Sequence, residues 1–362
     1  MREVDALLVL NHLRIGPITA RRLLDQFGSA TNILGAKASD VQRVGRLARD
    51  TVRRLMKWEQ DIDLAQIRET LEREQIKVVT YQDANYPPLL KEIYDHPLLF
   101  YMKGELTPQD AQALSVVGTR TPQAYGASIA RKWSAQLAAR GFTIVSGLAR
   151  GIDTQAHIGA LEAKGRTIAV LGYGFGYVYP KENQRLHDAI CERCAVITES
   201  AYRKFQGKSA FPLRNRLIAG LSRATLVVES RDRGGAMITA HFANEYNRSV
   251  YALPGSIYAT TSRGTNRLIR DGATLVRSVD DIVDEFTFLF PPDELEAARQ
   301  EMPKPSLDER EQALYDLLEE PMALDDLARK SEIGIEKVTT TMMTLELKGL
   351  VRCLPGKIYD RR

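Results

Sequence analysis

The sequence contains few cysteines, few aromatic residues and no long apolar run. Three cysteines in 362 residues are too few for a disulfide framework, so we expect a reducing, cytoplasmic environment. No stretch approaches the ~20 apolar residues of a membrane-spanning helix, and residues 1–17 lack the cleavage site of a signal peptide. With 44% hydrophobic and 27% charged residues, the composition excludes collagen-like, disordered and coiled-coil chains. The length predicts two or three domains.

The sequence also lacks complete metal and cofactor motifs. Cys191 and Cys194 form a CxxC pair, but no second pair or pair of histidines accompanies it in the spacing of a zinc site. The pair ends a predicted helix, whereas a redox-active CxxC begins one. Asp153 and His157 lie four residues apart on one predicted helix without a third ligand or nucleophile, so we interpret both as structural. We therefore predict no metal, no cofactor and no catalytic residue.

Hydrophobic periodicity divides the chain into three parts and a linker. Residues 1–80 predict a module of short helices, the clearest at 17–27, where a proline begins the helix. Residues 291–306 hold four prolines among mostly polar residues, which indicates a linker. Residues 307–362 predict three helices and a terminal hairpin, the pattern of a small winged helix.

Residues 81–290 alternate short runs rich in Val and Ile with helical patterns. Continuous apolar strands that alternate with helices indicate a mostly parallel sheet covered on both faces. We therefore predict an α/β fold, a Rossmann-like doubly wound domain. Its expected strands are 113–117, 143–145, 167–171, 196–198, 224–228, 250–253 and 274–276.

Several of the expected strands end in glycine. Gly118 follows the first strand, Gly147 follows the second, and Gly172 begins a glycine-rich turn after the third. Ligands of doubly wound sheets bind beyond the strand ends, where glycine lets backbone N–H groups approach an anion. One such turn often serves only tight packing, but three in succession favour phosphate binding. A nicotinamide enzyme is disfavoured, because Ser146 stands where an acidic ribose partner would end the second strand.

A basic stretch with no acidic residue runs from residue 200 to 223. Cations neutralise phosphates, and aromatic rings offer bases a stacking surface worth ~1–3 kcal/mol each. The net charge of +4 also conceals an asymmetry, since residues 1–290 carry +9 and residues 291–362 carry −5. The stretch therefore favours nucleic-acid binding at the glycine-lined strand ends. Its cations are Arg203, Lys204, Lys208, Arg214, Arg216 and Arg223, and its aromatic residues are Tyr202, Phe205 and Phe211.

Two further features remain open at the level of sequence. Glu199 and Glu229 each follow a strand, and in so basic a site we expect them to orient nearby arginines. Residues 13–29 resemble a helix–hairpin–helix, whose glycine turn either presents N–H groups to phosphate or serves only folding and domain contacts.

Many ordered segments of residues 100–280 resemble the DNA processing protein A family, also called DprA or Smf. Among them are VGTR (117–120), SGLARGIDTQAH (146–157), FPLRNRLIAGLS (211–222) and GTNRLIRDGA (264–273). The flanking parts are similar to the sterile-alpha-motif-like module and the winged helix of longer members. The sequence departs from the family at Gly234-Gly235-Ala236, where many members have Ser-Gly-Ser.

The resemblance implies a non-enzymatic protein that binds single-stranded DNA, protects incoming DNA and helps to load the recombinase RecA during natural transformation and recombination. It also implies a homodimer formed through the Rossmann-like domain. The DNA-contacting positions that it implies are Gly118, Thr119, Arg120, Gly147, Lys208, Phe211, Arg214 and Arg216.

Two alternatives belong to other functional classes. A Rossmann-like nucleotide hydrolase of the nucleoside-monophosphate phosphoribohydrolase type would need a Pro-Gly-Gly pattern with a catalytic Glu, and the chain has only Pro254-Gly255-Ser256. An adaptor acting through protein contacts would use an apolar surface such as residues 286–290. The winged helix is net acidic, so a protein contact there is at least as plausible as a DNA contact.

Overall fold

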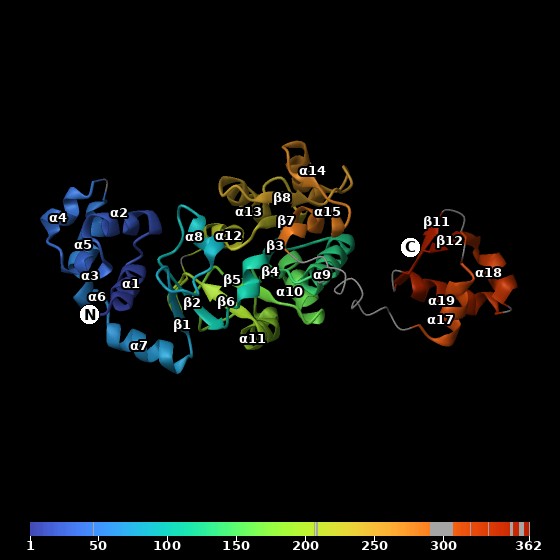
Figure 1. Cartoon of the computed structure of the whole chain (residues 1–362), viewed down its shortest axis with the longest axis horizontal. Coiled ribbons are helices and arrows are strands. Elements are labelled where there is room, and N and C mark those ends of the chain that lie inside the picture. The colour runs from blue at the N-terminus through green and yellow to red at the C-terminus, as the bar shows by residue number, and fades with distance from the viewer. Residues whose placement is uncertain are drawn as a thin grey trace. The chain divides into compact units, whose positions relative to one another are not determined.

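The computed structural model consists of two compact units, Met1–Gln300 and Glu301–Arg362, and each is described by itself (Figure 1). The structure describes residues 1–45, 47–205, 207, 209–289, 307–318, 320–331, 333–347, 350–354 and 358–361. The expected linker, residues 291–306, lies outside these ranges.

The larger unit is built on a nine-stranded sheet in the order β1-β2-β6-β5-β4-β3-β7-β8-β9. The strands from β6 to β9 in this order are parallel, and β1 and β2 extend the sheet in antiparallel fashion. The predicted doubly wound α/β class is therefore confirmed, with all seven expected strands present. The strands are β1 (Lys77–Thr80), β2 (Leu99–Gly104), β3 (Ala113–Gly118), β4 (Thr143–Ser146), β5 (Thr167–Leu171), β6 (Ala195–Thr198), β7 (Ala224–Glu229), β8 (Ser249–Ala252) and β9 (Thr274–Leu275).

The antiparallel strands β1 and β2 were not expected. β1 lies inside residues 1–80, which the periodicity assigned wholly to the helical module. This strand is only four residues long and begins soon after α7, so its sequence is too short to show an alternation of apolar and polar residues. It forms because its backbone pairs in register with β2, from Lys77 opposite Met102 to Thr80 opposite Leu99.

Helices cover both faces of the sheet (Figure 1). One face carries α9 (Ala124–Ala139) and α10 (Ile152–Glu162), which pack on Leu114, Ile144 and Leu226. The other carries α12 (Ala210–Gly220) and α13 (Gly235–Glu245), which pack on Val117, Val170 and Val227. Because successive strand residues point to opposite faces, each strand contributes to both cores. The remaining helices are α8 (Pro88–Glu92), α11 (Gln184–Arg193), α14 (Arg263–Arg270) and α15 (Asp280–Val283), with 3-10 turns η1 (Pro108–Gln112), η2 (Lys181–Asn183), η3 (Thr260–Ser262) and η4 (Asp284–Leu289).

The strand order reverses between β3 and β7. From β3 the chain proceeds through β4, β5 and β6 in one direction, and from β7 through β8 and β9 in the other. The loops after β3 and β7 therefore diverge, leaving a crevice beyond the carboxyl ends of these two strands.

The N-terminal helices pack against the β2 and β6 side of the sheet. One hydrophobic core runs from Leu7 and Leu23 in the helices to Tyr101 and Val196 in the sheet. Asn11 fixes the junction, because its side-chain amide donates to the Glu199 carbonyl (2.9 Å) and accepts from the Tyr101 hydroxyl (3.0 Å). The helices are α1 (Glu3–His12), α2 (Pro17–Phe27), α3 (Ala30–Gly35), α4 (Ala38–Arg43), α5 (Arg49–Met56), α6 (Trp58–Asp61) and α7 (Leu64–Arg73).

The smaller unit is a winged helix, as the pattern predicted. Three helices, α17 (Glu309–Asp316), α18 (Leu324–Ser331) and α19 (Ile335–Leu347), enclose a core with Leu314, Leu327 and Val338. A three-stranded antiparallel sheet in the order β10-β12-β11 completes it, from β10 (Met322–Ala323), β11 (Val351–Leu354) and β12 (Ile358–Arg361).

Candidate nucleic-acid interface

A cavity of about 900 Å³ opens beyond the carboxyl ends of β3, β4, β5 and β7, at the reversal of strand order. Its lining divides into a glycine- and arginine-rich side and an aromatic side. The first side comprises Gly118, Thr119, Arg120, Arg231, Arg233, Gly234 and Gly235, and the second comprises Tyr173, Tyr177, Tyr179, Phe205 and Phe211.

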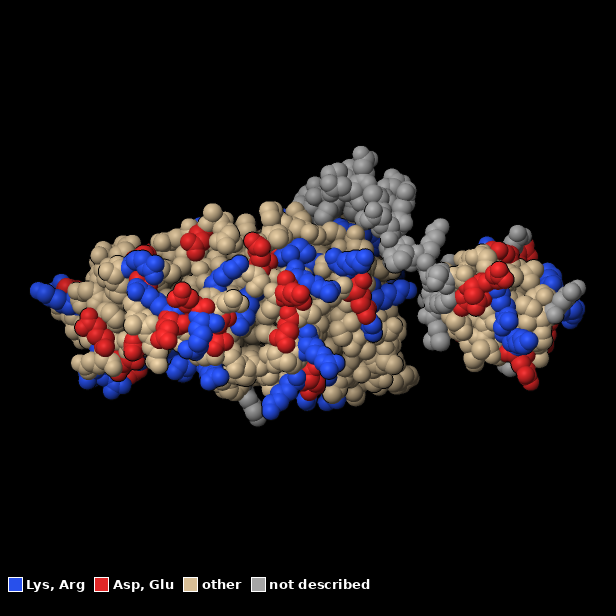
Figure 2. All heavy atoms as spheres, turned by 90° about the horizontal axis from the view of Figure 1, so that it is seen from below, with Lys and Arg blue, Asp and Glu red and all other residues tan. Residues whose placement is uncertain are grey.

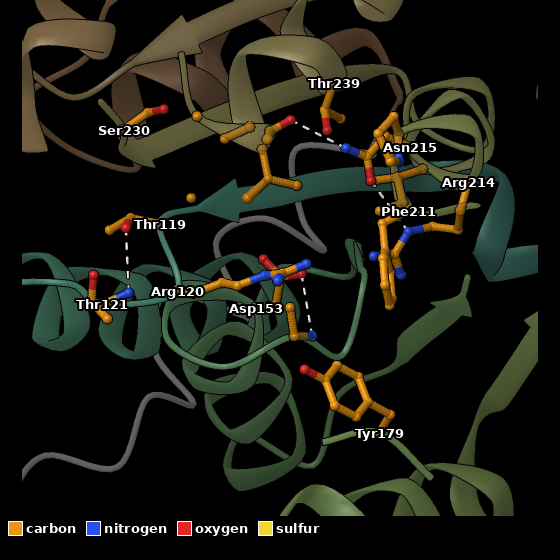
Figure 3. Close-up of a pocket in the computed structure, with 18 of the residues that line it drawn as sticks. Thr119, Arg120, Thr121, Asp153, Tyr179, Phe211, Arg214, Asn215, Ser230 and Thr239 are labelled. Carbon is orange, nitrogen blue, oxygen red and sulfur yellow. Dashed lines mark hydrogen bonds between the residues drawn. The ribbon is translucent and has the colours of Figure 1, made fainter. Parts of the chain in front are cut away.

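Arg120 and Phe211 approach each other across this cavity (Figure 3). The guanidinium carbon of Arg120 lies 5.3 Å from the centre of the Phe211 ring, in cation–π distance. Two further rings lie near Phe211, with centre-to-centre distances of 5.8 Å for Phe205 and 6.1 Å for Tyr179. Phe205 is 48% exposed and Tyr179 50%, so both rings offer faces to a ligand.

Hydrogen bonds hold the end of β3 against β7 and the start of α10, and this fixes the backbone position of Arg120. The Thr119 amide donates to the Glu229 carbonyl (2.7 Å), and the Ile152 amide donates to the Thr119 carbonyl (3.2 Å). A side chain at Gly118 would meet Ile152 at 2.5 Å, so only glycine fits between this strand end and α10. The glycine therefore serves close packing as well as access to the cavity.

Arg214 lines the cavity but is almost fully buried, with 7% of its surface exposed. Its guanidinium donates to the Gly147 carbonyl (2.7 Å) and to the Val170 carbonyl. Burial lowers the pKa of Arg214, and the charge of nearby Asp153 opposes that shift. Arg214 thus ties the turn after β4 to the end of β5, supporting the cavity wall from behind.

Gly147 does not line the cavity, because the Arg214 guanidinium occupies the space next to it. A Cβ at position 147 would lie 2.5 Å from Nη2 of Arg214. The amides of Gly147 and Ala149 donate to Asp153 Oδ2 at 3.1 and 3.4 Å. The turn at Gly147, which the sequence predicted to bind phosphate, is thus occupied by the charged side chains of Arg214 and Asp153.

Arg216 does not reach the cavity either. It lies two residues after Arg214 on α12, nearly opposite on the helix, and is 5% exposed. Its guanidinium donates to the Asp95 carbonyl (2.7 Å) and pairs with the Glu199 carboxylate. Burial by itself would lower the pKa of Arg216, but the charges of Glu199 and Asp95 outweigh it and raise that pKa. Lys208, the remaining expected contact, lies outside the described residues.

The structure therefore brings five of the eight expected residues to the cavity: Gly118, Thr119, Arg120, Phe211 and Arg214. It adds several that sequence reasoning missed, chiefly Tyr177, Tyr179, Arg231, Arg233 and Thr239. The segment LGYGFGYVYP, in which tyrosines alternate with glycines after β5, was an available signal. Arg231 and Arg233 directly follow β7, where the strand-end rule places ligands.

Two strand-end carboxylates and a buried histidine bond to other groups of the protein. Glu199 pairs with an arginine, as expected, but Glu229 does not: its carboxylate accepts from the Gln123 amide (3.0 Å) at the start of α9. His157 Nδ1 lies 2.6 Å from the Thr167 hydroxyl, and burial lowers its pKa to about 3. Among the described residues, no three His, Cys, Asp or Glu side chains are arranged to hold a metal ion.

Charges of both signs are interspersed over the face of the larger unit shown in Figure 2. No large patch of one sign dominates that face. Within the described residues, no helix is long and apolar enough to cross a bilayer.

The fold and site define a Rossmann-like protein with a cavity suited to phosphate on one side and to planar rings on the other. Residues 77–287 match the family described as DNA recombination-mediator protein A, and residues 298–357 match the DprA winged helix domain. The chain belongs to the DprA/Smf family.

Curated relatives support this assignment, one of them over nearly all of the chain. Protein Smf of Synechocystis sp. is 32% identical to it, and the match covers 96% of each chain. DNA processing protein DprA of Streptococcus pneumoniae is 44% identical over 57% of this chain and 73% of its own.

Two solved structures share the architecture. The X-ray structure of DprA from Streptococcus pneumoniae has a TM-score of 0.64 and 35% identity, covering 75% of this chain and 98% of that one. A structure of DNA processing protein A from Helicobacter pylori, described for its single-stranded DNA binding mode, has a TM-score of 0.54 and 25% identity. It covers 60% of this chain and 98% of that one.

Proposed function

We propose that the protein binds single-stranded DNA in the cavity at the β3–β7 reversal, without strong sequence preference. The observation that carries the proposal is the Arg120 guanidinium above the Phe211 ring, with Phe205 and Tyr179 beside it. A cation next to several accessible rings suits a chain of alternating phosphates and bases, because every base has a face that can stack. The Helicobacter pylori relative, described as a single-stranded DNA binder, supports the same ligand class.

In this proposal the two sides of the cavity bind different parts of a nucleotide. Phosphate lies over the turn Gly118–Arg120 and near Arg231 and Arg233, while a base stacks on Phe211. Thr239 also lines the cavity, where it is almost fully buried, with 1% of its surface exposed. Arg214 acts as a positioning residue, because it is buried and its Nη1 donates to two carbonyl groups of the cavity wall.

We propose that the protein acts by binding and not by catalysis. Asp153 is the one acidic residue among the described residues that line the cavity. Its Oδ2 already accepts hydrogen bonds from two backbone amides. Incubation of the purified protein with AMP tests this point against the phosphoribohydrolase alternative. Release of free adenine would overturn it, and unchanged AMP is the expected result.

Family membership extends the proposal to the biological role. We infer that the protein forms a homodimer, protects incoming DNA and helps to load RecA onto it in transformation and recombination. Light scattering of the full chain tests the dimer. Strand exchange by RecA on protein-coated DNA, with and without this protein, tests the loading step.

The central experiment compares charge reversals at opposite edges of the sheet. Arg120→Glu removes the cavity cation, whereas Lys164→Glu makes the same charge change in the exposed turn before β5, at the amino edge. By fluorescence anisotropy on labelled oligothymidylate, we expect Arg120→Glu to weaken binding by tenfold or more, which corresponds to at least ~1.4 kcal/mol. Lys164→Glu should bind like the unsubstituted protein. Equal affinities for the two variants would overturn the site assignment.

A further inference from the structure

A second cavity, of about 250 Å³, lies beside the first, across the beginning of α12. Its walls come from the hairpin between α1 and α2, which contributes Arg14 and Gly16, and from the strand ends after β5 and β6. Arg214 lines both cavities. The first turn of α12 separates them, with Phe211 on the side of the first and Leu213 on the side of the second.

The hairpin adds one cation to this second cavity. Arg14 is exposed, and none of the described residues forms an ion pair or hydrogen bond with its guanidinium. Its backbone is held in the left-handed region (φ 56°), where its amide donates to the Asn11 carbonyl (2.9 Å). The next amide, of Ile15, donates to the Leu10 carbonyl (3.1 Å). The position of Arg14 is therefore fixed by the turn, while its charge remains available.

The hairpin is also fixed relative to the sheet. Asn11, one turn before Arg14, donates to the Glu199 carbonyl and accepts from the Tyr101 hydroxyl. The apolar core of the N-terminal helices continues into β5 and β6 through Leu171 and Val196. A ligand that spans both cavities would thus bind to a preformed surface, so that ordering this surface would cost little binding free energy.

Three carboxylates share a cavity with Arg14, and two of them are paired with other arginines. Asp50 and Asp61 line a further cavity together with Arg14, and Asp50 pairs with Arg53 and Arg54. Glu199 lines the second cavity, but its carboxylate is engaged by the buried guanidinium of Arg216. Leu213, on the second-cavity side of the first turn of α12, is 55% exposed and offers an apolar surface there. Each cavity therefore holds an accessible cation and an apolar side chain: Arg120 with Phe211 in the first, and Arg14 with Leu213 in the second.

We propose that a single strand of DNA bound in the first cavity continues over the first turn of α12 into the second cavity, where Arg14 contacts one of its phosphates. This inference rests on the proposed function and deepens it. It makes the N-terminal helical module part of the DNA site, in addition to its packing role. In this proposal the turn that resembles a helix–hairpin–helix contributes the Arg14 side chain to phosphate, while the amides of Arg14 and Ile15 stay bonded within the hairpin.

The test uses the full chain and two oligothymidylates, one of ~4 nucleotides that fills only the first cavity and one of ~16 nucleotides that reaches beyond it. Arg14→Gln is compared with Arg22→Gln, a matched variant of an exposed arginine on α2 that lines neither cavity. Affinities are measured across a series of salt concentrations. Thermal melting of each variant checks that the fold is intact.

For the long oligonucleotide we expect Arg14→Gln to bind several-fold more weakly, with a slope of log K against log salt shallower by ~0.7, the loss of one phosphate contact. For the short oligonucleotide it should match the unsubstituted protein. If Arg14→Gln and Arg22→Gln bind the long strand equally well, the inference is overturned. Failure of the proposed function would look different, because the short strand would then not bind or Arg120→Glu would not weaken it.

Discussion

Arg120 and Phe211 contact each other across the cavity, although Arg120 follows β3 and Phe211 lies on α12, 91 positions further along the chain. The cation–π contact between them, at 5.3 Å, is worth ~0.5–1 kcal/mol at an exposed site. Stacking of a base on an aromatic ring is worth ~1–3 kcal/mol. In the proposed site, a base stacked on Phe211 would therefore gain more than the loss of the contact between the two side chains costs.

The first prediction concerns this aromatic platform. Phe211→Ala should weaken binding of oligothymidylate by ~1–3 kcal/mol, measured by fluorescence anisotropy, because the stacking surface is lost. Phe211→Tyr keeps the ring and should bind within a fewfold of the unsubstituted protein. If the alanine and tyrosine variants bind equally well, the ring does not stack on a base.

The second prediction separates a positioning residue from a contact residue. Arg214→Met should lower the free energy of unfolding by ~3 kcal/mol, because it removes the guanidinium donor from the carbonyls of Gly147 and Val170 and the nearby cation from the buried Asp153. Arg120→Glu should leave that free energy nearly unchanged, since Arg120 is exposed. Urea unfolding measures both. A stable Arg214→Met variant with weak DNA binding would instead make Arg214 a direct contact.

The third prediction compares two glycines, one in the turn after β4 and one at the start of α13. Gly147→Ala should destabilise the protein by ~1–3 kcal/mol, because the added Cβ would lie 2.5 Å from the Arg214 guanidinium. Gly235→Ala is the matched control: nothing lies within 4 Å of its Cβ position, and the residue begins α13. It should be neutral or stabilising by up to ~1 kcal/mol, since alanine favours a helix over glycine. Equal melting temperatures for the two variants would contradict the packing argument.

The fourth prediction is a pH dependence of stability from His157. The Thr167 hydroxyl donates to the Ile144 carbonyl (2.7 Å), so it accepts from Nδ1–H of His157. Nε2 is buried without a partner among the described residues, and protonation there would place an unpaired N–H in the core. Burial accordingly lowers the pKa of His157 to about 3.

The sign follows from the proton count. Between pH ~6.5 and about 3 the unfolded chain binds a proton at His157 that the folded chain does not, so the free energy of unfolding falls with decreasing pH, by up to ~1.4 kcal/mol per unit. His157→Asn should flatten this dependence, whereas His241→Asn, at an exposed histidine of α13, should not. Urea unfolding at several pH values measures the slopes. Parallel curves for His157→Asn and the unsubstituted protein would contradict the prediction.

Local sequence signals predicted much of the fold. The helix expected at 17–27 matches α2, because Pro17 begins it and Gly28, in the left-handed region (φ 78°), ends it. The seven parallel strands were recognisable because both of their faces are buried, which makes them continuous apolar runs. The short antiparallel strands β1 and β2 were missed, because pairing with each other and with β6 determines them more than their own pattern does.

By itself, the sequence determined the doubly wound class and the winged helix. Its glycine-ended strands indicated the edge of the sheet where the cavity lies, the basic stretch indicated Phe211, and the family resemblance indicated Arg120. The sequence could not distinguish Arg214 from Arg216, since both stand in the same basic stretch. The tertiary structure decided between them. A helix turns by roughly 100° per residue, so side chains two positions apart on α12 enter different surroundings: the carbonyls behind the cavity for Arg214 and the carboxylates of Glu199 and Asp95 for Arg216. Charge is a property of the residue, whereas its accessibility to DNA depends on what the rest of the chain packs against it.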